Sequence, residues 1–305
     1  MVAAMMHAEF ARNLKGVLGF PVTPFRPDLS LDYDGLARLS DWMAGFPFCA
    51  IVAAGGVAEI YSLTPDEIAG SVRCVVEAVN GRMPVVGSVG FNLPIAVDMA
   101  NRMEKAGASA LLVMPPYYSN APLDGLTEYY AGVGAATSLP ISIYSRDWAA
   151  FSPEQVARLA GRIPNLVFWK DGQGDARKYQ RIMRHVGDRL VWLGGIGDDC
   201  AATYFAIGVQ AFTSSVSNLS PKLSLKLAEL GLKQDFQALN ELLNRYVHPL
   251  FAMRERSRGY EVAVTKKAME ILGRPAGPVR PPLQSVQPQE AEMIRRLLED
   301  WTEFL

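Results

Sequence analysis

Short hydrophobic runs recur along the first 216 residues, separated by longer segments whose apolar residues are spaced as on one face of a helix. Each run is the length of one strand and ends at or beside Gly, Pro, Ser, Thr or Lys. An uninterrupted apolar run of this length is typical of a strand covered on both faces. We therefore predict strands at residues 17–22, 48–53, 84–88, 110–114, 141–144, 166–169, 190–193 and 211–214.

The segments between these runs begin with clear helix start signals. Thr64-Pro65-Asp66-Glu67 combines a capping threonine, a proline in the first turn and a glutamate three positions on. Asn92 and Ser152 open two more segments in a similar way. Strands that alternate with helices predict a parallel sheet, and eight units of about 30 residues match the (β/α)8 TIM barrel. A doubly wound open sheet fits less well, because it normally has fewer strands and no GxGxxG follows the first run.

The pattern changes after Pro221, where helical segments follow one another without strands. We predict a barrel over residues 1–220 that carries the active site, and a C-terminal helical extension over residues 221–305. The apolar faces of the extension can also support an oligomer interface. The predicted helices span residues 223–232, 236–256 and 261–272, and a proline-rich connector at 274–282 leads to a last helix at 287–304.

Composition favours a small-molecule ligand. The 30 Lys and Arg nearly balance the 31 Asp and Glu, whereas nucleic-acid and membrane-surface partners call for clustered basic charge. Cys49, Cys74 and Cys200 are odd in number and widely spaced, so we expect reduced core residues in a cytoplasmic protein. Residues 1–11 lack the apolar core of a signal peptide, and no run approaches the ~20 residues of a membrane span.

Polar and glycine residues collect at the predicted carboxyl ends of the strands, where barrels place their functional groups. Polar groups at five strand ends of one barrel predict a single pocket. For Tyr117 and Tyr118 packing at the rim is an equal alternative, and Arg146 and Asp147 can form a local ion pair. The residues at these ends are Thr23, Gly55, Gly56, Val57, Ser88, Tyr117, Tyr118, Tyr144, Arg146, Asp147, Lys170, Gly195, Thr213 and Ser214.

Lys170 is the most informative of these residues, because it directly follows the apolar run 166–169. A lysine at a strand end can simply enter solvent. Inside an apolar barrel, however, desolvation can lower its pKa by several units from about 10.4 and free the amine to attack a carbonyl. Tyr144 could then move protons, and Arg146 could hold a carboxylate.

Other chemistries fit the sequence less well. His7, His185 and His248 all lie away from strand ends, so a zinc or Ser-His-Asp site lacks its histidine, and we place His185 on the surface. Asp198 and Asp199 could bind a metal, but after Gly197 they more simply cap the next helix. The glycines at residues 194–197 could form a phosphate site, although no basic partner is near.

Several motifs together resemble the dihydrodipicolinate synthase/N-acetylneuraminate lyase superfamily over essentially the whole chain, and within it the 5-dehydro-4-deoxyglucarate dehydratase branch. The Tyr…Lys pair at the fifth and sixth strand ends is typical of the superfamily. Tyr-x-Arg-Asp and Lys-Asp-Gly-x-Gly-Asp favour the dehydratase branch. The motifs lie at residues 19–23, 53–63, 144–147, 170–175, 258–260 and 276–280.

This resemblance implies a Schiff base between Lys170 and an α-keto acid, with Tyr144 as proton relay and no metal or organic cofactor. It implies a homotetramer and a decarboxylating dehydration of 5-dehydro-4-deoxyglucarate to 2,5-dioxopentanoate. The residues expected to bind substrate are Thr23, Gly55, Gly56, Val57, Arg146, Gly195, Ser214 and Asn218.

The sequence departs from the branch in two places. Gly55-Gly56-Val57-Ala58-Glu59 stands where Gly-Gly-Thr-Gly-Glu is usual, and Ser217 replaces an aromatic residue before Asn218. Both departures fall on the expected substrate side. A pyruvate-dependent aldolase or synthase, and a non-catalytic keto-acid-binding relative, therefore stay open beside the dehydratase.

Overall fold

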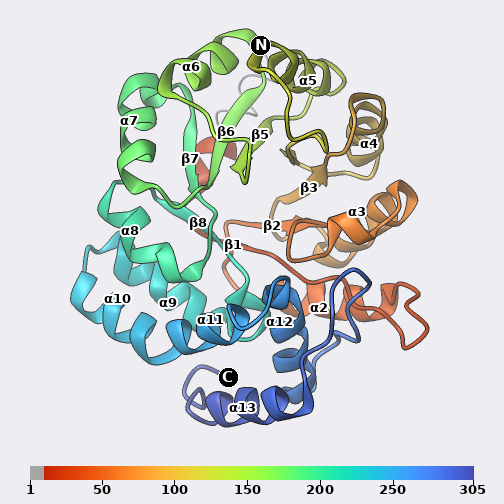
Figure 1. Ribbon diagram of the computed structural model, residues 1–305, viewed down its shortest axis with the longest axis vertical. Helices are drawn as coiled ribbons and strands as arrows, with labels where there is room; N and C mark the ends of the chain where they lie inside the picture. Colours follow the sequence, from red (N-terminus) through yellow and green to blue (C-terminus); the bar gives the residue numbers. More distant parts are fainter. Residues whose placement is uncertain (1–9) are drawn as a thin grey trace.

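Eight parallel strands close into a barrel in the computed structural model, which describes residues 10–305. They pair in chain order, and β8 pairs back to β1 (Figure 1). All eight predicted strands are confirmed. They are β1 (Gly16–Gly19), β2 (Ala50–Ala53), β3 (Val85–Val89), β4 (Ala110–Val113), β5 (Ile141–Arg146), β6 (Leu166–Gly172), β7 (Val191–Gly194) and β8 (Ala211–Ser214).

Several strands differ in length from the prediction, and the two largest differences, in β1 and β6, include residues at the mouth of the barrel. β1 ends at Gly19 because side chains take over the next amides: the Val22 N–H donates to Asn218 Oδ1 at 3.0 Å. β6 continues through Lys170 to Gly172, because its pairing with β5 persists as far as Arg146 opposite Gly172. Lys170 is thus part of the sheet.

Helices between the strands form an outer ring around the barrel (Figure 1). The predicted start signals are confirmed: Thr64 and Ser152 each form a capping box, and the Asn92 side chain accepts from the Ile95 N–H. The ring comprises α2 (Tyr33–Met43), α3 (Pro65–Val79), α4 (Leu93–Lys105), α5 (Leu123–Ala135), α6 (Pro153–Arg162), α7 (Ala176–Val186) and α8 (Ala201–Ala206).

The C-terminal helices gather on one side of the ring, at the lower end of the view in Figure 1. The predicted helix 236–256 is present but widens into a π-helical turn, where Pro249 has no N–H to offer the preceding turn. The last helix ends at Glu299, before the predicted end. The helices after β8 are α9 (Pro221–Leu232), which packs against β1 and β8, followed by α10 (Phe236–Leu242), the π turn η5 (Leu243–Val247), α11 (His248–Arg254), α12 (Tyr260–Ile271) and α13 (Pro288–Glu299).

One buried and one partly buried ion pair fasten this extension to the mouth of the barrel. Lys266 Nζ in α12 lies 2.6 Å from the carboxylate of Glu59, which follows β2, and both side chains are almost fully buried. Arg280 pairs with Glu67 of α3 at 2.6 Å and donates to the backbone carbonyls of Leu29 and Ser62. The loop after β2 is therefore held between barrel and extension.

Within residues 10–305, no helix combines the length and the apolar character that crossing a membrane requires. The expectation that residues 1–11 are not a signal peptide falls mostly on residues 1–9, which lie outside the described residues, as does His7.

Candidate active site

Lys170 lies inside the barrel, near its carboxyl end. Alternation along β6 points Phe168 and Lys170 inward, while Trp169 packs outward against Phe151. The lysine is only 4% exposed. Desolvation by burial, reinforced by the nearby positive charge of Arg146, lowers the pKa of Lys170 well below its usual value, and Asp171 opposes this only in part. The amine is thus favoured in its neutral, nucleophilic form.

Tyr144 is the direct neighbour of Lys170 across the sheet, since the two residues are in register on β5 and β6. The Lys170 nitrogen lies 3.3 Å from the centre of the Tyr144 ring. The Tyr144 hydroxyl donates to the Gly195 carbonyl at 2.9 Å, and burial raises its pKa to about 12. The phenol therefore keeps its proton at neutral pH and can donate it to a group formed at the lysine.

Gly195, directly after β7, fits against Lys170 because it lacks a side chain. A Cβ at this position would come within 2.5 Å of two Lys170 side-chain carbons. The loop is held by Tyr204, whose hydroxyl donates to the Asp171 carboxylate at 2.8 Å and accepts from the Ile196 N–H at 3.2 Å. Position 195 therefore requires glycine for the lysine to adopt this conformation.

Arg146 extends the polar wall beyond Tyr144. Its Nε lies 2.7 Å from the Asp147 carboxylate, so the local ion pair considered from the sequence is present. The guanidinium also lines the cavity, 5.3 Å from the centre of the Tyr144 ring and 5.9 Å from that of Tyr61. The pair engages Nε and leaves the terminal nitrogens for a ligand.

Only some of the substrate-binding residues predicted in the loops after β1 and β2 line the cavity. Gly56 and Val57 line the cavity. Gly55 packs against the Phe20 ring instead, and the Thr23 hydroxyl donates to the Ala58 carbonyl at 2.7 Å, so both residues shape the loop. Thr23 and Gly55 are absent from the cavity lining among the described residues.

The end of β8 uses most of its polar groups to hold the barrel together. Ser214 lines the cavity, but its hydroxyl bonds the Asp198 carboxylate and Ser224. The Asn218 side chain bonds the Val22 N–H and the Phe20 carbonyl, and among the described residues it is not part of the cavity lining. Ser217 is fully buried and bonds the Ser214 carbonyl, so this departure from the branch does not reach the cavity.

Asp198 corrects one expectation. It caps no helix: its carboxylate accepts from the N–H groups of Ser215 and Val216 and from two serine hydroxyls, so it orders the end of β8. Among residues 10–305, no three His, Cys, Asp or Glu side chains converge as a metal site would require.

The remaining sequence candidates lie outside the cavity. Tyr117 and Tyr118 are 89% and 67% exposed, so they do not pack at the rim within this chain. His185 lies on the surface as predicted. The three cysteines are free thiols with raised pKa values, although they are half-buried at the edge of the core and not inside it.

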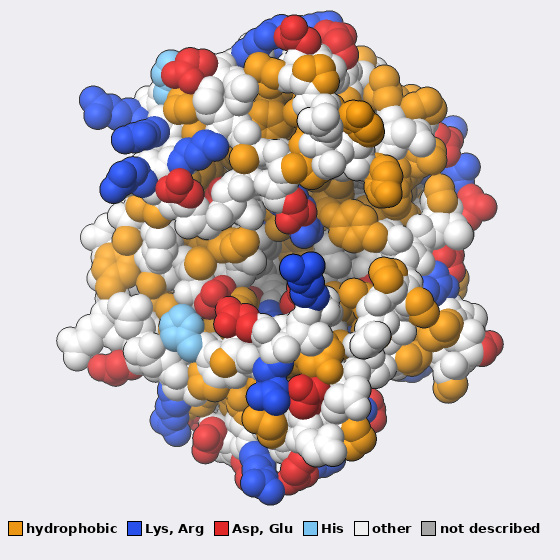
Figure 2. Space-filling model, viewed as in Figure 1, with side chains coloured by type: hydrophobic (Ala, Val, Ile, Leu, Met, Phe, Trp, Pro, Cys, Tyr) orange, Lys and Arg blue, Asp and Glu red, His pale blue; other side chains and the backbone are white. Residues whose placement is uncertain are grey.

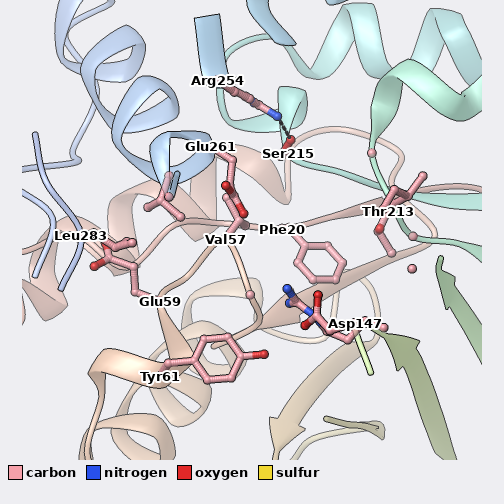
Figure 3. Close-up of a pocket in the computed structure, with 18 of the residues that line it drawn as sticks. Phe20, Val57, Glu59, Tyr61, Asp147, Thr213, Ser215, Arg254, Glu261 and Leu283 are labelled. Atoms are coloured by element: carbon pink, nitrogen blue, oxygen red, sulfur yellow. Dashed lines mark hydrogen bonds and ion pairs between the residues drawn. The ribbon is translucent and has the colours of Figure 1, made fainter. Parts of the chain in front are cut away.

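The strand ends and the extension together enclose a cavity of about 720 Å³, and Figure 2 shows the corresponding hollow at the centre of the molecule. Its far wall comes from the extension, which sequence reasoning did not place at the site. Arg254 and Glu261 reach toward it from above in Figure 3, opposite Tyr61 and Asp147. Arg258 and Gly259 of the Arg258-Gly259-Tyr260 motif, which in the sequence supports the family resemblance, line this wall. Thr213 and Ser215 also line the cavity.

Comparison with known proteins agrees with this geometry. Residues 13–301 match the model of the dihydrodipicolinate synthetase family. The chain belongs to this family. Within it, the chain is 38% identical over 300 residues to a "Probable 5-dehydro-4-deoxyglucarate dehydratase" of Bradyrhizobium diazoefficiens, covering 97% of this chain and 96% of the relative. A protein of the same name from Methylobacterium radiotolerans is 39% identical over 306 residues, with coverage of 98% and 99%.

Solved structures of the family show the same fold. Dihydrodipicolinate synthase from Oceanobacillus iheyensis superposes with a TM-score of 0.92 at 26% identity, covering 97% of this chain and 99% of that one. The synthase from Bacillus clausii gives a TM-score of 0.91 at 27% identity, with coverage of 96% and 99%. The resemblance inferred from the sequence motifs and the barrel fold are thereby confirmed.

Proposed function

We propose that this protein dehydrates and decarboxylates 5-dehydro-4-deoxyglucarate through a Schiff base at Lys170. The observation that carries the proposal is the environment of the Lys170 amine. Lys170 is 4% exposed, its pKa is lowered, and it lies beside Tyr144 in a cavity of about 720 Å³. The names of the similar proteins support the choice of substrate.

The first step forms the covalent intermediate. The Lys170 amine attacks the keto carbon of the substrate, and the carbinolamine loses its oxygen as water to give an iminium. Tyr144 supplies the proton for that departure, since its pKa of about 12 keeps the phenol protonated. The Gly195 carbonyl, which now accepts from the phenol, holds it beside the reacting carbon.

The iminium is the electron sink for the remaining steps. Loss of a proton from the neighbouring methylene gives an enamine, which expels the β-hydroxyl as water and leaves a conjugated iminium. The electron pair of the bond to the distal carboxylate then moves into this conjugated system, and carbon dioxide leaves. The dienamine that remains takes up a proton, and its terminal enol ketonises to the aldehyde. Hydrolysis of the iminium then frees Lys170 and 2,5-dioxopentanoate, so the balance is one substrate dianion and one proton to one product monoanion, one water and one carbon dioxide. No external cofactor is needed, because the lysine provides the sink.

In this proposal Gly56, Val57 and Gly195 bring backbone close to the bound keto acid, and Arg146 grips a carboxylate. Thr23, Gly55 and Asn218 act by holding the loops on which these contacts depend. Val57 provides no hydroxyl, so substrate binding relies on backbone and on Arg146. The homotetramer and the cytoplasmic location remain predictions.

Incubation with 5-dehydro-4-deoxyglucarate tests the proposal. We expect carbon dioxide and 2,5-dioxopentanoate in equal amounts, and borohydride reduction during turnover should leave a mass adduct on Lys170. An adduct with pyruvate and carbon–carbon bond formation with an aldehyde, without carbon dioxide release, would favour the aldolase or synthase. No adduct with any keto acid would favour the non-catalytic relative.

A further inference from the structure

Arg254 is a buried cation on the cavity wall that the steps above do not use. It ends α11 in the extension, is 7% exposed and lines the cavity. Its terminal nitrogens donate to the hydroxyls of Ser215 at 2.8 Å and Thr265 at 3.0 Å, and it lies 4.4 Å from the centre of the Phe251 ring. The side chain is thus fixed in place by β8, α11 and α12.

Within the described part of the chain, no carboxylate touches the Arg254 guanidinium directly, although the negative charges of Asp198, Glu261 and Asp199 lie near enough to act on it electrostatically. Among residues 10–305, no carboxylate oxygen lies within 4.0 Å of its guanidinium, whereas Arg146 and Arg280 each have one at 2.6–2.7 Å. The Asp198 carboxylate is separated from it by the Ser215 hydroxyl, which lies 3.1 Å from Asp198. A guanidinium has five N–H donors, of which two here bond neutral hydroxyls, and Nε is buried without a partner.

A buried, unpaired guanidinium is unfavourable unless something compensates its charge. In the cavity, the compensating group can come from a ligand. Figure 3 places Arg254 and Ser215 on the side of the cavity opposite Tyr61 and Asp147. Arg146 is paired with Asp147, so a ligand in the cavity can meet the guanidinium of Arg254 on one wall and that of Arg146 on the other. A dicarboxylate matches two such groups, and a monocarboxylate can engage only one.

We propose that Arg254 binds the carboxylate remote from the keto group, and so determines preference for dicarboxylic over monocarboxylic keto acids. This inference rests on the proposed Schiff-base function of the same cavity. It makes the C-terminal extension part of substrate recognition.

Glu261 opposes this role. Its carboxylate also reaches into the cavity in Figure 3, and its negative charge disfavours a ligand carboxylate nearby. Glu255, Arg258 and Glu261 are all exposed at this rim, where solvent screens their charges in part, but Glu261 is the one of the three that acts on the charge of Arg254. Glu261→Gln should therefore strengthen binding of a dicarboxylate, in the direction opposite to a change at Arg254.

The test compares two probes for Lys170. Pyruvate has one carboxylate and 2-oxoadipate has two. For each, the concentration giving half-maximal borohydride trapping on the intact protein is read by mass spectrometry. For Arg254→Gln we expect this concentration to rise about 10- to 100-fold for 2-oxoadipate and less than about twofold for pyruvate. Glu261→Gln should lower it severalfold for 2-oxoadipate alone. Arg245→Gln changes an exposed arginine outside the cavity and should alter neither value.

Equal shifts for both probes, or none for 2-oxoadipate, would overturn the inference. A purely structural role of Arg254 would weaken both probes alike and lower the melting temperature. If Arg254→Gln does not fold, Arg254→Lys provides the test, because it keeps the positive charge but not the two-pronged guanidinium. We expect a smaller rise in the half-maximal concentration, confined to 2-oxoadipate. Equal changes for pyruvate and 2-oxoadipate would refute the inference. Failure of the unmodified protein to trap either probe would instead refute the proposed function.

Discussion

Two lysines are almost completely buried in this protein, and they differ in what faces them. Lys266, in the clamp between extension and barrel, lies 2.6 Å from the Glu59 carboxylate and donates to the Pro278 carbonyl at 2.9 Å. Lys170, in the cavity, has the ring faces of Tyr144 and Phe20 at 3.3 and 5.1 Å from its nitrogen, and no carboxylate oxygen within 4.0 Å among residues 10–305.

The comparison shows that two buried lysines can differ in what opposes the effect of burial on their pKa values. Burial lowers the pKa of Lys266 to about 8, and Glu59 opposes the shift, so the amine remains largely protonated at pH 7. For Lys170, burial and the charge of Arg146 act in the same direction, and Asp171 opposes them only in part. The absence of a carboxylate in direct contact, together with the adjoining cavity, distinguishes the proposed nucleophile Lys170 from the ion-paired Lys266.

The largest expected effect follows replacement of the unpaired lysine. Lys170→Met should abolish keto-acid trapping and lower carbon dioxide release at least about a thousandfold, because among residues 10–305 no other lysine lines the cavity. The free energy of unfolding should fall by less than about 1 kcal/mol, since the variant removes a buried amine that has no ionic partner. Trapping at a different lysine in this variant would contradict the assignment.

Replacement of the ion-paired Lys266 should instead mainly lower the stability of the protein. Lys266→Met leaves the Glu59 carboxylate buried without its partner and should cost about 3–5 kcal/mol of unfolding free energy, measured in urea at neutral pH. Lys233→Met is the matched control, because the Lys233–Glu229 pair has the same 2.6 Å separation but is 67% and 43% exposed. That control should cost less than about 1 kcal/mol. Similar losses in the two variants would show that burial of the pair contributes nothing.

The two lysines also differ in how far the sequence could predict them. Lys170 was predictable because a charge at the end of an apolar run is unusual, and its position in the (β/α)8 pattern places it at the mouth. Lys266 lies in a helix whose sequence shows no feature that marks this lysine as buried, and its partner Glu59 is more than 200 residues away in the sequence. Such a pairing depends on how the extension folds back onto the barrel, which local periodicity does not encode.

The same limit explains the site residues. Strand ends could be read from the sequence, so Lys170, Tyr144, Arg146 and Gly195 were placed correctly in the cavity. The direction of a side chain could not be read from the sequence. The Asn218 side chain, which was expected to bind substrate, is hydrogen-bonded to backbone groups of Val22 and Phe20. No local feature of the sequence predicted that Arg254 lines the cavity, because its position there depends on how α11 packs beside the end of β8.

The pH dependence of trapping separates a perturbed lysine from an ordinary one. An exposed lysine reacts about tenfold faster with each pH unit up to about 10.4, because its neutral fraction rises that much. The lowered pKa of Lys170 means that its amine is already neutral at lower pH, so the pyruvate-adduct rate should level off well below that value and fall only in acid. Initial rates with cyanoborohydride between about pH 5 and 9 provide the measurement. A tenfold rise per unit across this range would exclude a depressed pKa.

The smallest expected effect concerns Arg146, whose positive charge is the second cause of the lowered Lys170 pKa. Arg146→Gln removes that charge, so the protonated lysine becomes less unfavourable and the pH profile of trapping should move to higher pH. Burial remains the larger cause, so the profile should stay below that of an exposed lysine. Because Arg146 also lines the cavity, the rates must be measured at saturating pyruvate, where weaker binding no longer affects them. Arg146→Lys keeps the charge and should leave the profile in place; a shift of equal size in both variants would assign the effect to lost packing over the Tyr144 ring and not to charge.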